Sequence, residues 1–445
     1  METLDRRLQK RMHVSLYALL FLTCLLGLSV LLEGCTDTCD TKVEYTVMTP
    51  LYTSFEEIRA STGMTSSRPI SSVGKIYIKD ELLFINDPGK GIHIIDNSDP
   101  AHPKAKSFLN IPGNYDLAVK GNTLYADSYV DLVAFNIQNV DQITEVSRRH
   151  GVFSYFSSDF GFIAEAERGI ITGWADTQHI DVTHGKCGAV SSVQPMFCYD
   201  NGVAVKSSAS FFESLAIAPG TGSGPGVGGS MARFTITNNH LFALNSGTLV
   251  PFDLTVEASP QIKPSTQVSW DVETIFPYKN HLFLGSRSGM HILNISSPEN
   301  PVFVSTYQHI NSCDPVVVDD QYAYVTLRSG TECQGITNQL EVINIENLSS
   351  PQLLKVYPMT NPHGLGVDEN MLFLCDGTDG LKIFDVADVN AIDQNLLAHY
   401  TGINTYDVIP FNNLLIMNSS SGLYQYDYSN PHDIKFLSFI PADAN

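Results

Sequence analysis

The stretch MLFLCDGTDGLKIFDV, residues 371–386, decides the fold, because its pattern recurs along the chain. One apolar strand leads into a tight turn, and a second strand ends in Asp385. Both strands are rich in Ile, Leu, Phe and Val and are bounded by Gly and Asp, which is typical of a β-hairpin. Asp or Asn occupies the position of Asp385 seven times: Asp96, Asn136, Asp253, Asn294, Asn344, Asp385 and Asp427.

An aromatic residue usually ends the strand before each of these positions, and the two series keep the same spacing. Its members are Phe84, Tyr125, Phe242, Phe283, Tyr324 and Phe373, with Leu415 in the seventh place. Most spacings are close to 41 residues, which is enough for about four short strands. Seven such units predict an all-β fold, a β-propeller of seven four-stranded antiparallel blades. Asp and Asn bond the backbone two residues on, so we interpret their series as structural.

The end of the chain suggests how the ring closes. Residues 434–440 resemble residues 104–111, which we take as the opening strand of a unit. The first unit, starting near Lys75, lacks such a strand. We therefore expect the C-terminal segment to complete the first blade, which would remove exposed sheet edges.

The repeat resembles the LVIVD-repeat family, with GIHIID (91–96), LEVINI (340–345) and LKIFDV (381–386) as the best matches. The resemblance covers about residues 70–441, apart from an insertion. It implies a β-propeller and a bacterial lipoprotein of unassigned activity.

The insertion lies at about residues 140–229, where one spacing grows to 117 residues. Two interpretations stay open. The insertion is an excursion from one blade, which we favour because neither series has a member there, or it is a degenerate eighth blade. Its Gly-rich end, PGTGSGPGVGG (219–229), predicts a flexible linker.

The N-terminus predicts export. Arg6, Arg7, Lys10 and Arg11 precede the apolar run 14–32, and Leu32-Glu33-Gly34-Cys35 resembles a lipobox. We expect residues 1–34 to be a signal peptide, Cys35 to carry palmitate and other lipid, residues 35–72 to form a tether, and residues 73–445 to form the propeller. An uncleaved signal anchor is the alternative, since the run is long enough to span a bilayer. Both place the domain outside the cytoplasm, and we expect a bacterial outer-membrane lipoprotein of the cell envelope.

Charge and cysteines agree with export. The net charge of −21 excludes nucleic acid as a natural partner, because phosphate contacts need Lys and Arg. We expect a monomer. In an oxidising compartment disulfides are expected, and we predict Cys313–Cys333 and Cys187–Cys198, with Cys375 as a buried free thiol.

Candidate binding residues stand near the start of the strand that enters each unit: Asp116, Asp271, Asp314, His363 and Asp407. We expect them around one mouth of the central channel. Such a mouth would suit Ca²⁺ or the hydroxyls of a glycan, although no cofactor is required. The alternative is that they bond their own loops.

Three functions remain open. The first is a membrane-tethered binding or scaffold module for a glycan, a peptide or an envelope protein. The second is a structural envelope protein. The third is a metal-dependent hydrolase, with less support because the chain carries no G-x-S-x-G, H-E-x-x-H or P-loop motif. We assign no catalytic residue.

Overall fold

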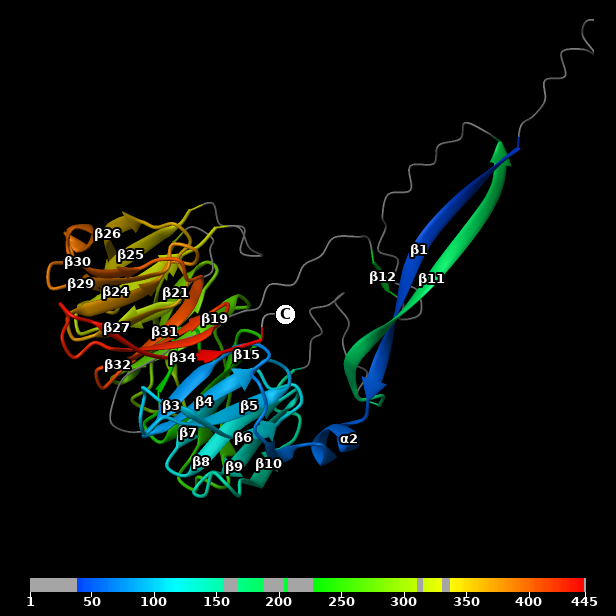
Figure 1. The fold of residues 1–445 in the computed structure, drawn as a ribbon, viewed down its shortest axis with the longest axis horizontal. Coiled ribbons are helices and arrows are strands. Elements are labelled where there is room, and N and C mark those ends of the chain that lie inside the picture. Colours follow the sequence, from blue (N-terminus) through cyan, green and yellow to red (C-terminus); the bar gives the residue numbers. More distant parts are fainter. Residues whose placement is uncertain are drawn as a thin grey trace, which may run out of the picture. The chain divides into compact units, whose positions relative to one another are not determined.

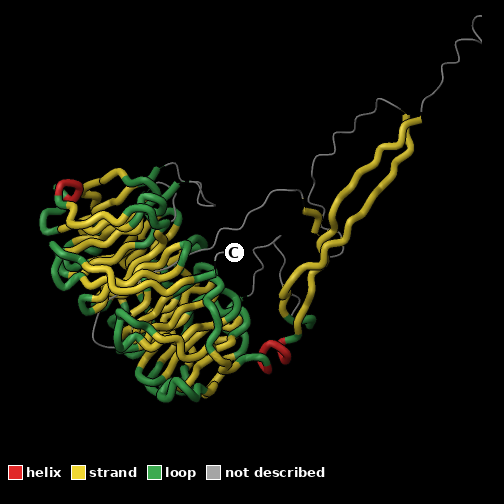
Figure 2. The backbone as a smooth tube through the Cα atoms, viewed as in Figure 1, coloured by secondary structure: helices red, strands yellow, loops and turns green. Residues whose placement is uncertain are grey.

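The computed structural model describes residues 38–154, 167–186, 204–206, 227–309, 315–329 and 337–443. The chain divides into two compact units, Met1–Tyr52 with Ile171–Phe211, and Thr53–Ile170 with Phe212–Asn445. Figures 1 and 2 show that both units are built almost entirely from strands. None of the helices in the described ranges is long and apolar enough to cross a membrane.

The second unit holds seven sheets, each built on consecutive antiparallel strands, and the first sheet has one further strand at either edge. The first three blades contain β3 (Ile76–Lys79), β4 (Leu82–Asp87), β5 (Gly91–Asp96) and β6 (Lys104–Asn110); β7 (Leu117–Lys120), β8 (Thr123–Ser128), β9 (Asp131–Asn136) and β10 (Thr144–Arg149); and β14 (Phe234–Thr237), β15 (His240–Asn245), β16 (Thr248–Asp253), β17 (Gln261–Ile262) and β18 (Thr266–Gln267).

The last four blades have the same order. They contain β19 (Val272–Tyr278), β20 (His281–Ser286), β21 (Gly289–Asn294) and β22 (Val302–Gln308); β23 (Val316–Val318), β24 (Tyr322–Leu327), β25 (Gln339–Asn344) and β26 (Gln352–Pro358); β27 (Leu365–Asp368), β28 (Met371–Cys375), β29 (Leu381–Asp385) and β30 (Leu396–Tyr400), with the 3₁₀ turn η1 (Ile392–Gln394); and β31 (Thr405–Phe411), β32 (Leu414–Ser419), β33 (Gly422–Asp427) and β34 (Lys435–Pro441).

The first strands of successive blades contact one another from β3 to β31, and a shared buried core joins the seventh blade to the first. This arrangement confirms the predicted seven-bladed β-propeller.

The Asp and Asn series has the structural role that the sequence suggests. In all seven blades its side-chain oxygen accepts the backbone N–H two residues on, as in Asp96 with Ser98 at 3.1 Å and Asn294 with Ser296 at 2.8 Å. The bond ends the third strand and starts the turn to the fourth.

The aromatic series is the blade core. Phe84, Tyr125, Phe242, Phe283, Tyr324, Phe373 and Leu415 all lie on the second strand of a blade and are at most 1% exposed. A β-bulge recurs between the third and fourth strands of every blade except the third. Bulges increase local twist, which suits sheets that splay outward from a common centre.

The predicted closure of the ring is wrong. Strand β6 pairs with β5 as the outer strand of its own blade, and β34 pairs with β33 as the outer strand of the seventh. The sequence pattern placed the unit boundary one strand too early, because the outer strands of two blades look alike. Each blade is therefore continuous in sequence, and no strand is exchanged.

Side chains join the seventh blade to the first instead. Ile76, Ile78 and Ile85 of the first blade share one buried core with Ile409 and Ile416 of the seventh. Farther out, the amides of Asn97 and Gln425 donate to each other, both at 2.9 Å. Both residues are buried, so the pair satisfies polar groups that water does not reach.

The described part of the insertion is not a blade. Strand β11 (Ile170–Lys186) and the short strand β12 (Ala204–Lys206) lie on either side of β1 (Thr38–Thr53) in a separate three-stranded sheet. Figure 1 shows β1 and β11 running in opposite directions. The segment expected to be a tether thus supplies the central strand of this sheet.

The chain between β1 and the first blade packs onto the propeller. It contains the helix α2 (Phe55–Ala60) and strand β2 (Gly63–Ser66). Arg59 of α2 binds Asp131 of the second blade at 2.8 Å, and β2 pairs with the free edge of β6. One outer edge of the propeller is therefore covered by the chain itself.

The amide pair between Asn97 and Gln425 gives a direct test of ring closure. Gln425→Leu leaves the buried Asn97 amide without its partner and should lower the free energy of unfolding by about 1–3 kcal/mol. Asn97→Leu combined with Gln425→Leu should recover most of that loss, because both polar groups are then removed. Denaturant titration of the single and double variants measures the difference. Gln352→Leu on the exposed face of β26 is the control, and equal losses in the single and double variants would contradict the prediction.

Candidate functional site

The predicted mouth residues share a position in the blades but not a common site. Asp116 and Asp271 directly precede β7 and β19, His363 precedes β27, and Asp407 lies in β31. All four are buried, with exposures of 6% or less. Asp314 lies outside the described residues.

A segment of the chain occupies the centre of the ring. Strand β13 (Val227–Gly228) pairs with β3 of the first blade and contacts β31 of the seventh. The Ser230 hydroxyl accepts the Leu365 N–H of the sixth blade at 3.1 Å. The Ala232 carbonyl accepts the Ile275 N–H of the fourth blade at 2.8 Å.

This central segment, residues 227–233, therefore bonds to strands on opposite sides of the ring before it enters the third blade. The last residues of the segment that was expected to be a flexible linker, 219–229, form strand β13 instead. A β-carbon on Gly228 would lie 3.1 Å from the Tyr77 ring, so glycine lets the segment pass close to the first blade.

Asp116 holds the central segment. Its Oδ2 accepts the Arg233 N–H at 2.6 Å and lies 3.9 Å from Lys75 Nζ. The Lys75 ammonium donates to the Met231 carbonyl of the same segment at 3.0 Å. Burial lowers the pKa of Lys75 to about 7, against the opposing effect of Asp116. Burial also raises the pKa of Asp116, although Lys75 and Arg233 oppose that shift.

His363 and Asp271 bond their own surroundings. The His363 ring lies 3.1 Å from an Arg328 nitrogen, and burial together with that guanidinium lowers the pKa of His363 to about 3. His363 is thus neutral near pH 7 and poorly matched to acid–base catalysis there. Burial acts to raise the pKa of Asp271, but hydrogen bonds from Ser269 and Ser288 outweigh it and leave the pKa lowered. The local-bonding alternative therefore describes Asp271.

Asp407 differs from the other three. It is fully buried, and neither carboxylate oxygen accepts a hydrogen bond within the described part of the chain. A β-carbon on Gly364 would lie 2.0 Å from Asp407 Oδ1, so only glycine fits beside it. Burial raises the pKa of Asp407 well above its ordinary value, with the Val408 amide and Lys75 opposing the shift.

A group of side chains with metal-binding chemistry lies elsewhere, between the third and fourth blades. The ligand atoms of His240, Asp253 and Glu299 lie within 4.8 Å of one another. However, Lys263 Nζ lies 3.3 Å from Asp253 and 2.5 Å from Glu299. The lysine already supplies the positive charge that the two carboxylates attract.

Exposed apolar residues recur on the outer strands, and sequence analysis missed them. In every blade, one residue of the outer strand pairs with the third-strand residue that comes just before the Asp or Asn of the series. In the third to seventh blades this residue has a large apolar side chain that is 46–57% exposed. We call these residues the apolar belt: Ile262, Phe303, Leu353, Leu396 and Phe436.

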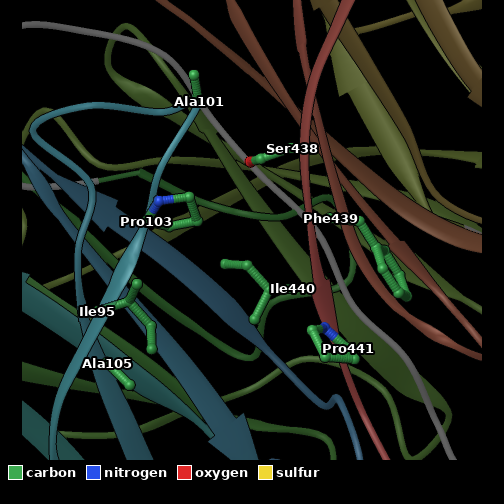
Figure 3. Close-up of a pocket in the computed structure, with 8 residues that line it drawn as sticks. All are labelled: Ile95, Ala101, Pro103, Ala105, Ser438, Phe439, Ile440 and Pro441. Atoms are coloured by element: carbon green, nitrogen blue, oxygen red, sulfur yellow. The ribbon is translucent and has the colours of Figure 1, made fainter.

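The first two blades break the belt, with Ala105 and Glu145 at the equivalent position. Where Ala105 stands, a groove of about 390 Å³ remains between the first and seventh blades. Figure 3 shows its walls, with Ile95 and Pro103 on one side and Ile440 and Pro441 on the other.

The cysteine predictions are decided only in part. Cys375 is a buried free thiol, as expected. Cys35, Cys187, Cys198, Cys313 and Cys333 lie outside the described residues.

Lys75 and the apolar belt were the main omissions of the sequence analysis. Lys75 is a single lysine before a strand, and no pattern marks it. Each outer strand contributes only one residue to the belt, so no single strand shows the pattern. An alignment of the seven units on their Asp and Asn residues brings the belt residues into one column.

The buried ammonium of Lys75 predicts a pH dependence. The folded state has a pKa of about 7 for Lys75 and the unfolded chain an ordinary one near 10.5. Between these values the unfolded state binds more protons, so this group makes stability rise with pH. Lys75→Met should remove that rise, so the wild type should gain stability relative to the variant from pH 7 to pH 10 in denaturant titrations. Lys355→Met, at an exposed position, controls for the lost charge. Parallel profiles for wild type and Lys75→Met would refute the placement of this ammonium.

No model of a known protein family and no curated protein matches the sequence. Similar solved structures include the computationally designed Ika8 protein, with 10% identity, a TM-score of 0.49, and coverage of 86% of this chain and 92% of that one. BamB from Moraxella catarrhalis has 8% identity, a TM-score of 0.45, and coverage of 87% and 97%. A protein from Lactobacillus plantarum has 10% identity, a TM-score of 0.46, and coverage of 81% and 96%. The strand order of the seven sheets, rather than these likenesses, establishes the propeller.

Proposed function

We propose that the protein is a lipid-anchored binding or scaffold module of the bacterial envelope, and that its apolar belt binds a partner protein. The belt is the observation that carries this proposal. Its five side chains stand at one register position on consecutive blades, so they follow the outer rim as one series. A contiguous exposed apolar surface is typical of an interaction site, and this proposal takes the belt to act as one.

The charge around the belt indicates the character of the partner. In the third to seventh blades, the turn that leads to each belt residue carries an acidic side chain and no Lys or Arg: Glu257, Glu299, Glu346, Asp388 and Asp433. Lysines pair with three of these carboxylates, Lys120 with Glu257, Lys263 with Glu299 and Lys435 with Asp433. Apolar side chains bordered by both charge signs favour a protein surface of mixed charge as the partner.

A glycan has less support as the partner. Sugars are held by hydrogen bonds and aromatic faces, whereas three of the five belt residues are Ile or Leu. A hydrolase also has less support. Of the predicted mouth residues, Asp116 bonds the central segment, while Asp271 and His363 bond neighbouring side chains.

The anchor and the location rest on the sequence. The basic N-terminus, the apolar run 14–32 and Cys35 support a lipoprotein, and the LVIVD resemblance points the same way. A tether of this kind would raise the local concentration of the propeller near envelope partners. We propose an outer-membrane location on the same basis.

Site-specific crosslinking tests the belt. A photoreactive phenylalanine analogue placed at Phe303 or Leu353 in the full chain, expressed in bacterial cells, should form a discrete adduct with another protein. The same analogue at Ala105 or Glu145 should form none, because the belt is interrupted there. A Lys at the neighbouring belt position should reduce the adduct several-fold.

Other results would contradict this proposal. Equal adducts at Ala105 and Phe303, or none at any position, would exclude the belt as the binding surface. An adduct of twice the chain mass would make it an interface between two copies instead.

Labelled palmitate tests the anchor. Cys35→Ala should abolish incorporation of the label into the chain and, because the uncleaved precursor lacks the mature N-terminus, should leave a band of higher mass. Cys39→Ala, four residues on, is the matched control and should label normally. Unchanged mass and no label in the wild type would favour the uncleaved signal anchor.

A further inference from the structure

Asp407 is a fully buried acidic side chain in β31. Its side chain is 0% exposed, and neither oxygen has a hydrogen-bond partner among the described residues. The Val408 N–H opposes the rise in the pKa of Asp407, but it does not form a hydrogen bond to either carboxylate oxygen. An ionised carboxylate removed from water normally requires donors or a counter-charge.

Two buried amide oxygens, those of Asn418 and Asn86, also lack donors among the described residues. Asn418 lies directly opposite Asp407 in the β31–β32 pair, so both side chains are on the same face of the sheet. Its Nδ2 donates to the Gly74 carbonyl at 3.3 Å, and its Oδ1 has no partner in the described ranges. Asn418 is 0% exposed.

Asn86 of the first blade lies against Gly74, the residue whose carbonyl Asn418 contacts. Its Nδ2 donates to Asn114 Oδ1 at 2.7 Å, while its Oδ1 is left without a donor among the described residues. A β-carbon on Gly74 would lie 2.3 Å from that oxygen. Gly74 thus contacts both residues: its carbonyl accepts the Asn418 amide, and the Asn86 side chain fills the position that a β-carbon of residue 74 would take.

The surrounding charges do not compensate Asp407. Arg233 lies 3.3 Å from Asp127, which also accepts the Tyr115 and Asp116 N–H groups. Lys75 lies nearer to Asp116 and donates to the central segment. Lys75 and Arg233 thus lie within ion-pair distance of Asp116 or Asp127, and no ion pair to Asp407 is present among the described residues.

We propose that Asp407, Asn418 and Asn86 bind a hard cation, Ca²⁺ or Na⁺, between the seventh and first blades. Four oxygen atoms without donors are the ligand type that such ions prefer. A water molecule would satisfy the amide oxygens but would not balance the charge. The ion would link β31 and β32 to β4, across the junction where the ring closes, and it would be out of reach of a substrate.

This site is independent of partner binding by the apolar belt. Its role is structural, since a ligand that binds only the folded state stabilises it. Because the oxygens are buried, the ion enters during folding, so the test must begin with the unfolded chain.

The full-length chain in a mild detergent would be unfolded in guanidinium with a chelator. It would then be refolded in CaCl₂, NaCl or tetramethylammonium chloride at equal ionic strength. We expect Ca²⁺ or Na⁺ to raise the melting temperature by about 3 °C at about 100 times its Kd. The salt that does so identifies the ion, and elemental analysis of the refolded protein should find it at one ion per chain if it is Ca²⁺.

Asp407→Asn should lose this cation-dependent shift, while Asp271→Asn should keep it, because Asp271 is satisfied by Ser269 and Ser288. Asn418→Asp gives a second readout if Asp407→Asn does not fold. The added carboxylate should enlarge the Ca²⁺-dependent shift and lower stability in tetramethylammonium chloride.

The proposal is overturned if no salt shifts the melting temperature of the wild type and Asp407→Asn is equally stable. Asp407 would then be a protonated acid, for which Asn is a close substitute. A shift that Asp407→Asn retains would place the ion elsewhere and would also overturn it.

Discussion

The junction between the seventh and first blades is the contact on which the ring depends, because the first and last blades meet there without exchanging a strand. Other neighbouring blades are joined by continuous backbone, whereas this junction is held by packing and hydrogen bonds alone. The packing comes from the isoleucine-rich core. The hydrogen bonds are those of the Asn97 and Gln425 amides and the bond from the Asp443 N–H to the Ile70 carbonyl at 2.8 Å. The proposed cation site lies at the same junction, where an added link would stabilise the ring most.

The central segment changes what the propeller offers to other molecules. A ring with an open channel would expose the polar ends of its inner strands, as in the predicted acidic mouth. Here residues 227–233 use those polar groups: Asp116 bonds Arg233, and Lys75 bonds Met231. The outer rim then holds the exposed apolar residues, and binding through the rim is the function that this geometry favours.

The sequence predicted the propeller because its repeat reports local chemistry. An Asp or Asn that bonds the backbone two residues on ends a strand wherever it occurs, and an aromatic residue at a fixed distance packs inside the same sheet. Both depend on neighbours within one hairpin. The closing strand was mispredicted because Lys104–Asn110 and Lys435–Pro441 have similar sequences, and similarity cannot say which sheet a strand joins. Of the proposed mouth residues, Asp116 lies 3.9 Å from Lys75 and Asp407 acts electrostatically on the same lysine, whereas Asp271 and His363 bond other neighbours.

The sequence by itself determined the repeat, its strand and turn positions, and the structural role of the Asp and Asn series, since all of these rest on contacts a few residues apart. The number of blades needed the structure, which places β11 and β12 of the insertion in a separate sheet. Tertiary structure alone decided how the ring closes, that β1 pairs with β11, and that residues 227–233 cross the centre. It also decided that Asp407 is left without a donor while Asp271 is not. These outcomes depend on groups brought together from distant parts of the chain, as in the contact of Asn97 with Gln425, and no local pattern records such distances.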